Sequence, residues 1–407
     1  MAYQSFFNKV IAIKAQSALG SPASGTGATV LRVTGGTPGK LTKTAIESKE
    51  VRADAQRTRG RHGFQATAGS YDIEVSVGAI DPILQAILRG TWDSEITATS
   101  ADFTSIAIAG NVITWAGGSP IAKGFRVGDV SELTGSATTA NNSKNLRIGA
   151  LSATTMTTVD TLAADAGPDS ALSIIRRGRK VIMPAAGALV LTYFTIEEYD
   201  VDLDVSTVFS DCFFNSIKFS MAANGMLMAT IGWIGTGDIT AEASVAAPIF
   251  TSPTTPSGVP MSVKDATLRF GSTDLADLTS FDLTVDNGAV APQVVGAVKS
   301  PTVMPGQNSV SMNLAMLRTD LSNLSDYIGE TGMALHLLAV DTSVEPKNFL
   351  SINVPFFTLG GVEPAAPSTQ GGALTETISI PAALVGQDTS GSGYDATMAS
   401  FQISNNV

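Results

Sequence analysis

The 407 residues carry few charges and a net negative charge, and together these features exclude several classes of protein. Charged residues make up 15% of the chain, below the roughly 25% of an ordinary globular protein, and the formal net charge is −11. We expect about two or three domains and a surface largely covered by further copies of the chain. The acidic balance disfavours a protein that binds nucleic acid through its phosphates. The single cysteine excludes an internal disulfide.

The sequence gives no support for a membrane, metal or cofactor site. Residues 1–9 lack the charged start and long apolar core of a signal peptide. The longest apolar stretch, residues 181–191, contains Pro184 and Gly187 and is too short to span a bilayer. His62 and His336 lie far apart, so no zinc or haem centre is expected. We expect a chain that needs no cofactor and stays in the compartment where it is made.

The first 95 residues predict strands, a long loop and a short helix. In chain order we expect a strand over 30–33, a Gly/Pro turn over 35–39, a loop over 52–70, a strand over 71–77 and a helix over 81–88. The strict apolar and polar alternation from Tyr71 is typical of a half-buried strand. Asp81 and Pro82 predict the N-cap and the first residue of the helix.

Residues 96–178 differ in composition and predict a separate small module. The segment is rich in Thr, Ser, Ala and Gly, and turn residues separate its short apolar runs. We expect strands over 105–108, 112–115, 125–130, 146–151 and 156–162. This pattern indicates an all-β module inserted into another fold.

The remainder of the chain predicts more strands and a repeat of the first pattern. We expect strands over 190–205, 213–221 and 226–234, a linker over 243–261, a strand over 281–286, a long loop over 287–308, a strand over 309–316 and a helix over 320–328. Asn224-Gly225 is a strong hairpin signal. The expected organisation is therefore 1–95 and 179–242 as the two halves of a first unit, 96–178 as an inserted module, 243–261 as a linker and 262–407 as a second unit.

Carboxylates recur at alternate positions in three segments. They are Asp72 and Glu74; Asp200, Asp202 and Asp204; and Asp282 and Asp286. Alternate residues of a strand point to one side of the sheet, so each segment predicts an acidic face opposite an apolar one. Three interpretations are open: an ordinary solvated face, an acidic wall inside a closed barrel that repels DNA phosphates, and a calcium site, which the missing ligand spacing disfavours.

An arginine cluster stands out in this acidic chain. It comprises Arg52, Arg57, Arg59 and Arg61 in the first long loop. A solvated loop and a DNA-binding loop are alternatives, and the net charge weakens the second. We favour a loop that reaches carboxylates of a neighbouring subunit, because the planar guanidinium fork suits such contacts.

No arrangement of residues predicts catalysis. Residues 35–41 superficially resemble a phosphate-binding loop, but Leu41 replaces the required Ser or Thr and no helix pattern follows. Neither histidine lies near a nucleophile in a suitable context, and Cys212 beside two phenylalanines is typical of a small buried residue. We expect a protein that is not an enzyme.

Four segments resemble the major tail (tail tube) proteins of long, non-contractile-tailed, siphovirus-type bacteriophages. They are residues 28–33 with 46–52, residues 69–88, residues 215–235 and residues 281–295, which includes Val285-Asp286-Asn287-Gly288. With the strands that link them, they span roughly two-thirds of the chain, while 96–178 departs from the family pattern. The resemblance implies a mainly β fold class: duplicated tail-tube β-sandwich or barrel units with short flanking α-helices, plus the inserted small all-β module.

The resemblance also implies an assembly. Rings of such proteins stack into a tube through which the genome is ejected, and a duplicated chain implies homotrimeric rings with pseudo-sixfold symmetry, with homohexameric rings as the alternative. The implied partners are the chain itself, the tape measure protein and phage DNA inside the lumen without sequence-specific binding, and the tail terminator and distal tail proteins. The implied location is the virion tail, assembled in the host cytoplasm.

On this interpretation the residues singled out above acquire roles. The candidate lumen-facing acids are Asp72, Glu74, Asp200, Asp202, Asp204, Asp282 and Asp286. The candidate contacts between rings or subunits are Arg52, Arg57, Arg59, Arg61, Val294, Val295 and Lys299. The alternative function is a capsid decoration or shell protein; a secreted adhesin or carbohydrate-binding module and a hydrolase are less favoured.

Overall fold

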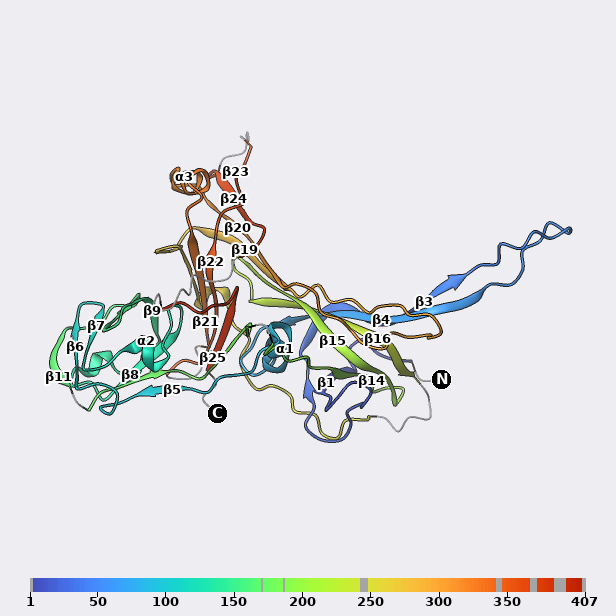
Figure 1. Cartoon of the computed structure of the whole chain (residues 1–407), viewed down its shortest axis with the longest axis horizontal. Helices are drawn as coiled ribbons and strands as arrows, with labels where there is room; N and C mark the ends of the chain where they lie inside the picture. Colours follow the sequence, from blue (N-terminus) through green and yellow to red (C-terminus); the bar gives the residue numbers. More distant parts are fainter. Residues whose placement is uncertain are drawn as a thin grey trace.

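The computed structural model describes residues 3–169, 171–185, 187–241, 248–341, 346–366, 372–383 and 393–404. Within them the protein is mainly β, with its strands in three sheets and a few short helices between them (Figure 1). This confirms the fold class expected from the sequence.

The largest sheet has eleven strands and runs through the middle of the molecule (Figure 1). Its strands are β1 (Lys9–Ala15), β2 (Thr29–Val30), β3 (Val33–Ile46), β4 (Arg61–Glu74), β14 (Phe194–Asp200), β15 (Val205–Ala222), β16 (Met228–Ala241), β19 (Leu278–Asp286), β20 (Ser309–Leu317), β23 (Gly361–Pro364) and β24 (Thr375–Ile380). The long strand β15 has β16 along one edge, and on the other edge it pairs first with β14 and then with β19. The β3–β4 hairpin extends away from the rest of the molecule as an arm (Figure 1).

A six-stranded sheet packs against the large sheet and encloses the main core. Its strands are β13 (Arg179–Ile182), β17 (Ala266–Phe270), β18 (Thr273–Asp274), β21 (Met333–Val340), β22 (Phe349–Phe357) and β25 (Ser400–Ser404). Phe219 of the large sheet meets Phe401 of the smaller one edge-on, with ring centroids 5.9 Å apart. Helix α1 (Asp81–Leu88) buries Ile83, Leu84, Ile87 and Leu88 in this core, whereas helix α3 (Ser322–Ile328) has no buried residue.

The third sheet has eight strands and its own core. Its strands are β5 (Ile96–Ala98), β6 (Ser105–Ala109), β7 (Val112–Ala116), β8 (Val130–Thr134), β9 (Leu146–Leu151), β10 (Thr155–Thr158), β11 (Asp165–Asp169) and β12 (Ser173–Arg176), with helix α2 (Pro120–Lys123) beside them. Trp115 is buried between Phe103 and Phe125 in edge-on contacts. Two single 3₁₀ turns, η1 (Thr139–Asn141) and η2 (Val263–Asp265), complete the elements.

The same sequence of elements occurs twice outside the eight-stranded sheet. The first repeat is β1, β2, β3, β4, α1, β14, β15 and β16, and the second is β17, β18, β19, β20, α3, β21, β22 with β23, and β24 with β25. Corresponding strands pair with corresponding partners: β3–β4–β16–β15 in one repeat matches β19–β20–β24–β23 in the other. The hairpins β14–β15 and β21–β22 also carry a bulge at the same place, between Phe194 and Ile196 and between Met333 and Leu335. The fold is therefore duplicated.

Several predicted elements are wrong. The strand expected over 30–33 is broken at residues 31–32, between β2 and β3, and the strand expected over 125–130 is absent, since β8 begins only at Val130. Residues 35–39 form no turn; they lie inside β3, where two bulges accommodate glycine and proline. The expected strand over 190–205 is interrupted, because residues 201–204 form a turn in which Asp204 adopts a left-handed backbone (φ 53°). The first long loop is shorter than expected, since β4 already begins at Arg61.

The hairpin at Asn224-Gly225 and the long connection over 287–308 are confirmed, and the first helix is confirmed with one local correction. Asn224 (φ 62°) turns the chain between β15 and β16, and residues 287–308 connect β19 to β20. The first predicted helix has the expected bounds, but its N-cap is Ile80 with no side-chain cap. Asp81 is instead the first helical residue, and its carboxylate pairs with Arg179.

Candidate functional site

One face of the large sheet is polar over both repeats. The register aligns Asp72, Thr230, Lys218, Thr284 and Ser311 across β4, β16, β15, β19 and β20. The neighbouring row on the opposite face, Ile73, Ala229, Phe219, Leu283 and Met312, is buried in the core. Because side chains alternate along each strand, the sheet has one face in the core and one polar face.

Four of the predicted acids share this polar face. Asp72 and Glu74 lie on β4, and Asp282 and Asp286 lie on β19. The Thr230 hydroxyl donates a hydrogen bond to Asp72 (2.6 Å), and Lys218 forms an ion pair with Asp282 (3.2 Å). Lys218 and Thr230 were not singled out in the sequence, although each alternates with core residues in a strand of the β15–β16 hairpin.

The other three predicted acids lie elsewhere, at the turn between β14 and β15. Asp202 accepts hydrogen bonds from the Asn8 amide and the Ser5 backbone N–H (both 2.7 Å), and these bonds lower its pKa. Asp204 accepts a hydrogen bond from the Tyr199 hydroxyl (2.9 Å), and Asp200 lies 3.7 Å from the Lys9 ammonium. The alternation inferred from these three residues is that of a turn, so they do not form one face of a strand.

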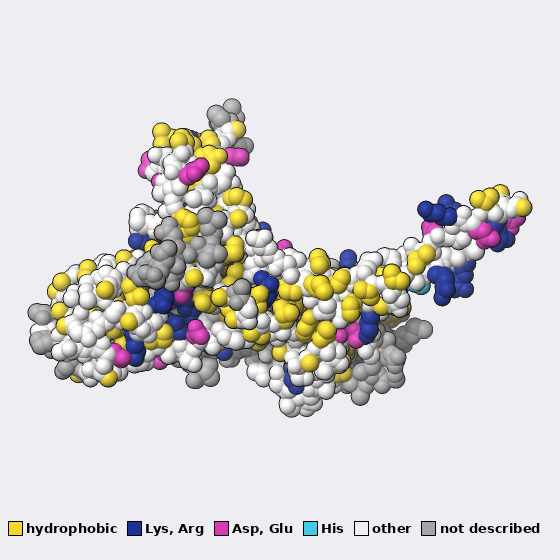
Figure 2. Space-filling model, in the orientation of Figure 1, with side chains coloured by type: hydrophobic (Ala, Val, Ile, Leu, Met, Phe, Trp, Pro, Cys, Tyr) yellow, Lys and Arg dark blue, Asp and Glu magenta, His cyan; other side chains and the backbone are white. Residues whose placement is uncertain are grey.

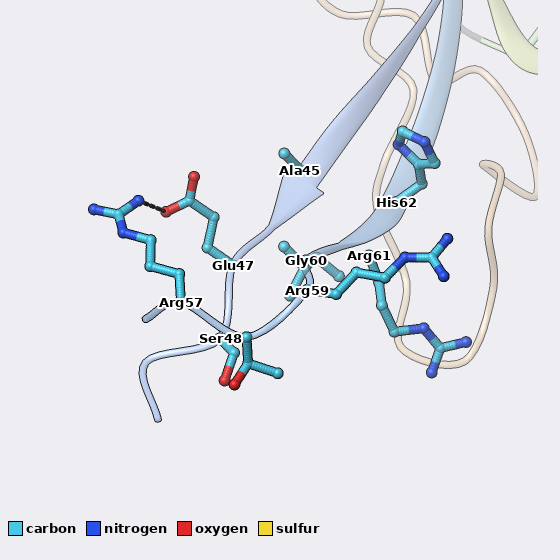
Figure 3. Close-up of a pocket in the computed structure, with 10 residues that line it drawn as sticks. Ala45, Glu47, Ser48, Arg57, Arg59, Gly60, Arg61 and His62 are labelled. Carbon is cyan, nitrogen blue, oxygen red and sulfur yellow. Dashed lines mark hydrogen bonds and ion pairs between the residues drawn. The ribbon is translucent and has the colours of Figure 1, made fainter. Parts of the chain in front are cut away.

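The arginine cluster lies on the arm, at and beside its tip. Arg52 binds Asp54 through two nitrogens and lowers the pKa of that carboxyl. Arg57 reaches Glu47 across a hollow at the base of the tip (3.3 Å), whereas Arg59 and Arg61 point away from this pair (Figure 3). In the part of the chain that the structure describes, no carboxylate lies within ion-pair distance of Arg59 or Arg61.

Loop 287–308 folds back on the first repeat. Lys299 forms an ion pair with Asp238 of β16 (3.0 Å), and the Val298 carbonyl accepts a hydrogen bond from the backbone N–H of Gln65 on β4 (2.7 Å). Val294 and Val295 are 43% and 107% exposed, so their side chains are open to a partner. The loop thus holds one repeat against the other and still presents an apolar surface.

The structure also places charges inside the molecule that no sequence pattern indicated. Lys180 of β13 is buried between Asp129, on the chain just before β8, and Asp395, just before β25. Burial raises the pKa of Asp129; it also opposes charging of Lys180, but the two carboxylates outweigh this effect and raise the pKa of Lys180. The three residues are far apart in the sequence, so no local spacing could reveal them.

Neither a membrane-spanning helix nor a cluster of metal ligands occurs among the described residues. No described helix is both long and apolar enough to cross a membrane. Over the same residues, no three His, Cys, Asp or Glu side chains are grouped so as to hold a metal ion.

Comparison with known proteins assigns the chain to a family. A sequence profile of the family described as phage tail tube protein matches residues 7–382, which include the first repeat, the eight-stranded sheet and the second repeat through β24. A search of curated proteins finds no match. Since the profile covers most of the chain, the protein belongs to the phage tail tube family and is a structural component of a virion tail.

Proposed function

We propose that copies of this chain form rings, and that the rings stack into the tail tube of a long, non-contractile, siphovirus-type phage. The tube would be the channel for genome ejection, and the chain would assemble in the host cytoplasm. The observation that carries this proposal is the duplicated sheet with one continuous polar face. A sheet of this kind becomes a channel wall when copies join edge to edge.

Homotrimeric rings with pseudo-sixfold symmetry follow from the duplication, because three chains supply six repeats. Homohexameric rings of whole chains are the alternative. We propose the boundaries 1–95 and 179–242 for the first tube unit, 96–178 for an outward-facing module, 243–261 for the linker and 262–407 for the second unit.

The polar face is the proposed lumen. Asp72, Glu74, Asp282 and Asp286 would face phage DNA and repel its phosphates, so that DNA passes without sticking and without sequence-specific binding. Lys218 would moderate this field where it pairs with Asp282. The tape measure protein would occupy the same lumen before DNA, and the tail terminator and distal tail proteins would meet the two ends of the tube.

The arm and loop 287–308 are the proposed contacts between rings or subunits. Arg59 and Arg61, which have no ion-pair partner among the described residues, offer guanidinium groups for carboxylates of a neighbour, and Val294 and Val295 offer apolar surface. Figure 2 shows that the end of the arm carries both basic and acidic side chains. Such mixed charge suits a contact between identical copies.

Electron microscopy and thiol labelling test this function together. Purified chain should form hollow filaments in negative stain, whereas closed shells or decorated lattices would support a capsid role instead. In assembled filaments, Asp282→Cys should resist a thiol reagent too bulky to enter the channel. The control Lys144→Cys, on the exposed surface of the eight-stranded module, should be labelled. Cys212 is buried and adds no background. Equal labelling of both positions would contradict the lumen assignment.

A further inference from the structure

The two repeats are joined inside the chain by one strand pair, β15 with β19. The pair is antiparallel and places Ser216 opposite Asp286, Ile217 opposite Val285 and Lys218 opposite Thr284. Strand β15 ends the four-strand series of the first repeat, and β19 begins that of the second. The β15–β19 pair therefore shows, within one chain, how the sheet of one repeat joins the sheet of the next.

The strands that correspond to β15 and β19 in the other repeat are β23 and β3, and each has an edge with no partner strand among the described residues. Over the residues that the structure describes, β3 pairs with β4 alone and β23 with β24 alone. Strand β3 corresponds to β19, and β23 corresponds to the second half of β15. The two open edges lie far apart, β3 on the arm and β23 at the top of the view in Figure 1, so one chain cannot join them to each other.

The bulges determine which residues of β3 and β23 correspond to residues of the β15–β19 pair. Phe194–Cys212 and Met333–Phe357 are the pairs at the matching bulges, and the same offset relates Ser216 to Gly361. Burial agrees with this alignment: Phe214 and Ile217 face the core three residues apart, as Leu359 and Val362 do. Following the register through β24 and β20 in one repeat, and through β16 and β4 in the other, relates Asp286 to Thr42.

We propose, building on the assembly proposed above, that β23 of one copy pairs antiparallel with β3 of a second copy of this chain. Gly361 lies opposite Thr42, Val362 opposite Leu41, and Glu363 opposite Lys40. The pairing completes the sheet with the geometry that β15 and β19 already show. Both of these unpaired strand edges are then covered by a neighbouring copy of the chain.

The chemistry of the two strands matches on both faces. Val362 and its partner in β24, Ile378, lie on the core side, as Leu41 and its partner in β4, Thr67, do. Glu363 and Lys40 lie on the polar side, where both are exposed. An apolar pair on one face and an opposite-charge pair on the other are the cross-strand pairs that stabilise antiparallel sheets.

Helix α3 supports the same docking surface. It lies beside β23, and Leu321 and Ile328 are 60% and 74% exposed there. The matching helix α1 is covered, and Arg89 at its end binds the Asn308 side chain of the other repeat. Among the described residues, the end of the molecule with β23 and α3 thus lacks the neighbour that its counterpart has within the chain.

Disulfide trapping tests the register. Lys40→Cys with Glu363→Cys in one chain should give chains linked to one another in oxidised filaments. The control Lys43→Cys with Glu363→Cys moves one thiol by three residues, roughly 10 Å along the strand, beyond disulfide reach. Linked species reaching three chains and stopping there support the pairing in a ring of three. Linked species reaching six chains support the pairing but place whole chains in a sixfold ring.

Charge reversal gives a second measurement that needs no disulfide. Lys40→Glu should raise the critical concentration for filament formation about fivefold, since like charges then face each other across the strands. Lys40→Glu with Glu363→Lys should restore it, and Lys264→Glu, at an exposed lysine elsewhere, should leave it unchanged. If the unaltered chain forms no filaments, the proposed function fails. If it forms filaments with no linkage above the control and no rescue, the pairing alone is wrong.

Discussion

His336 shows how the interior constrains one titratable residue. The sequence placed it in an apolar strand, and the structure confirms this: it lies in β21, buried, with its ring nitrogen 2.7 Å from the Ser351 hydroxyl. Burial, together with the nearby charge of Arg147, lowers the pKa of His336 to about 3. The charged groups facing it from neighbouring elements are Arg147, Asp274, Arg269 and Lys180. The residue is therefore neutral in the folded protein at ordinary pH.

This burial predicts a pH dependence of stability. Between pH 6.5 and about 3 the unfolded chain binds a proton at His336 that the folded chain does not bind. The free energy of unfolding should therefore fall as pH decreases below 6.5, by up to roughly 1.4 kcal/mol per pH unit from this residue. His336→Gln keeps a hydrogen-bonding partner for Ser351 and should remove that part of the slope. Urea unfolding at pH 7, 5.5 and 4.5 measures it, and equal slopes in both proteins would contradict the assignment.

Single residues also show where the sequence was insufficient. The alternation around Asp72 and Asp282 identified residues of one sheet face, because each lies in a regular strand. The alternation around Asp202 was misleading, since a turn whose carboxylates bind Asn8 and Tyr199 produces the same pattern of letters. Periodicity records the spacing of side chains but not the dihedral angles that give it meaning.

At the scale of elements, the proposed contact between rings can be tested by shortening the arm. Its strands β3 and β4 pair along their length, and residues 47–60 form the tip. Replacing residues 48–59 with two glycines keeps both strands and removes most of the tip. If the tip connects rings, the variant should form rings that do not stack, visible by negative stain and analytical ultracentrifugation. A Gly/Ser segment of the original length is the matched control for length. Normal tubes from the shortened chain would remove the stacking role.

Elements were predictable where a local rule decides them. Asn224 gave the β15–β16 hairpin, and alternation gave β19 and β20 with the loop between them. The turn expected over 35–39 failed because an edge strand with bulges tolerates glycine and proline. The pairing of β15 with β19 joins segments separated by the linker, and nothing local in either strand specifies that partner.

At the scale of the whole molecule, one buried cluster ties three parts together. Lys180 follows the eight-stranded module, Asp129 belongs to it, and Asp395 belongs to the second repeat. Lys180→Met should lower the free energy of unfolding by about 3 kcal/mol or more, because two buried carboxylates then lose their counter-charge. Lys299→Met, which breaks the half-exposed pair with Asp238, should cost less than about 1 kcal/mol. Denaturant unfolding compares them, and equal losses would show that the buried cluster is not the anchor.

The β15–β19 pair has a consequence for how the protein responds to dilution. Its two strands belong to one polypeptide, so they meet at an effective concentration set by the connecting segment and not by the amount of protein present. Half of the repeat-to-repeat contacts would then form during folding and persist at any dilution. In the proposed assembly, only the contacts between separate molecules would weaken on dilution.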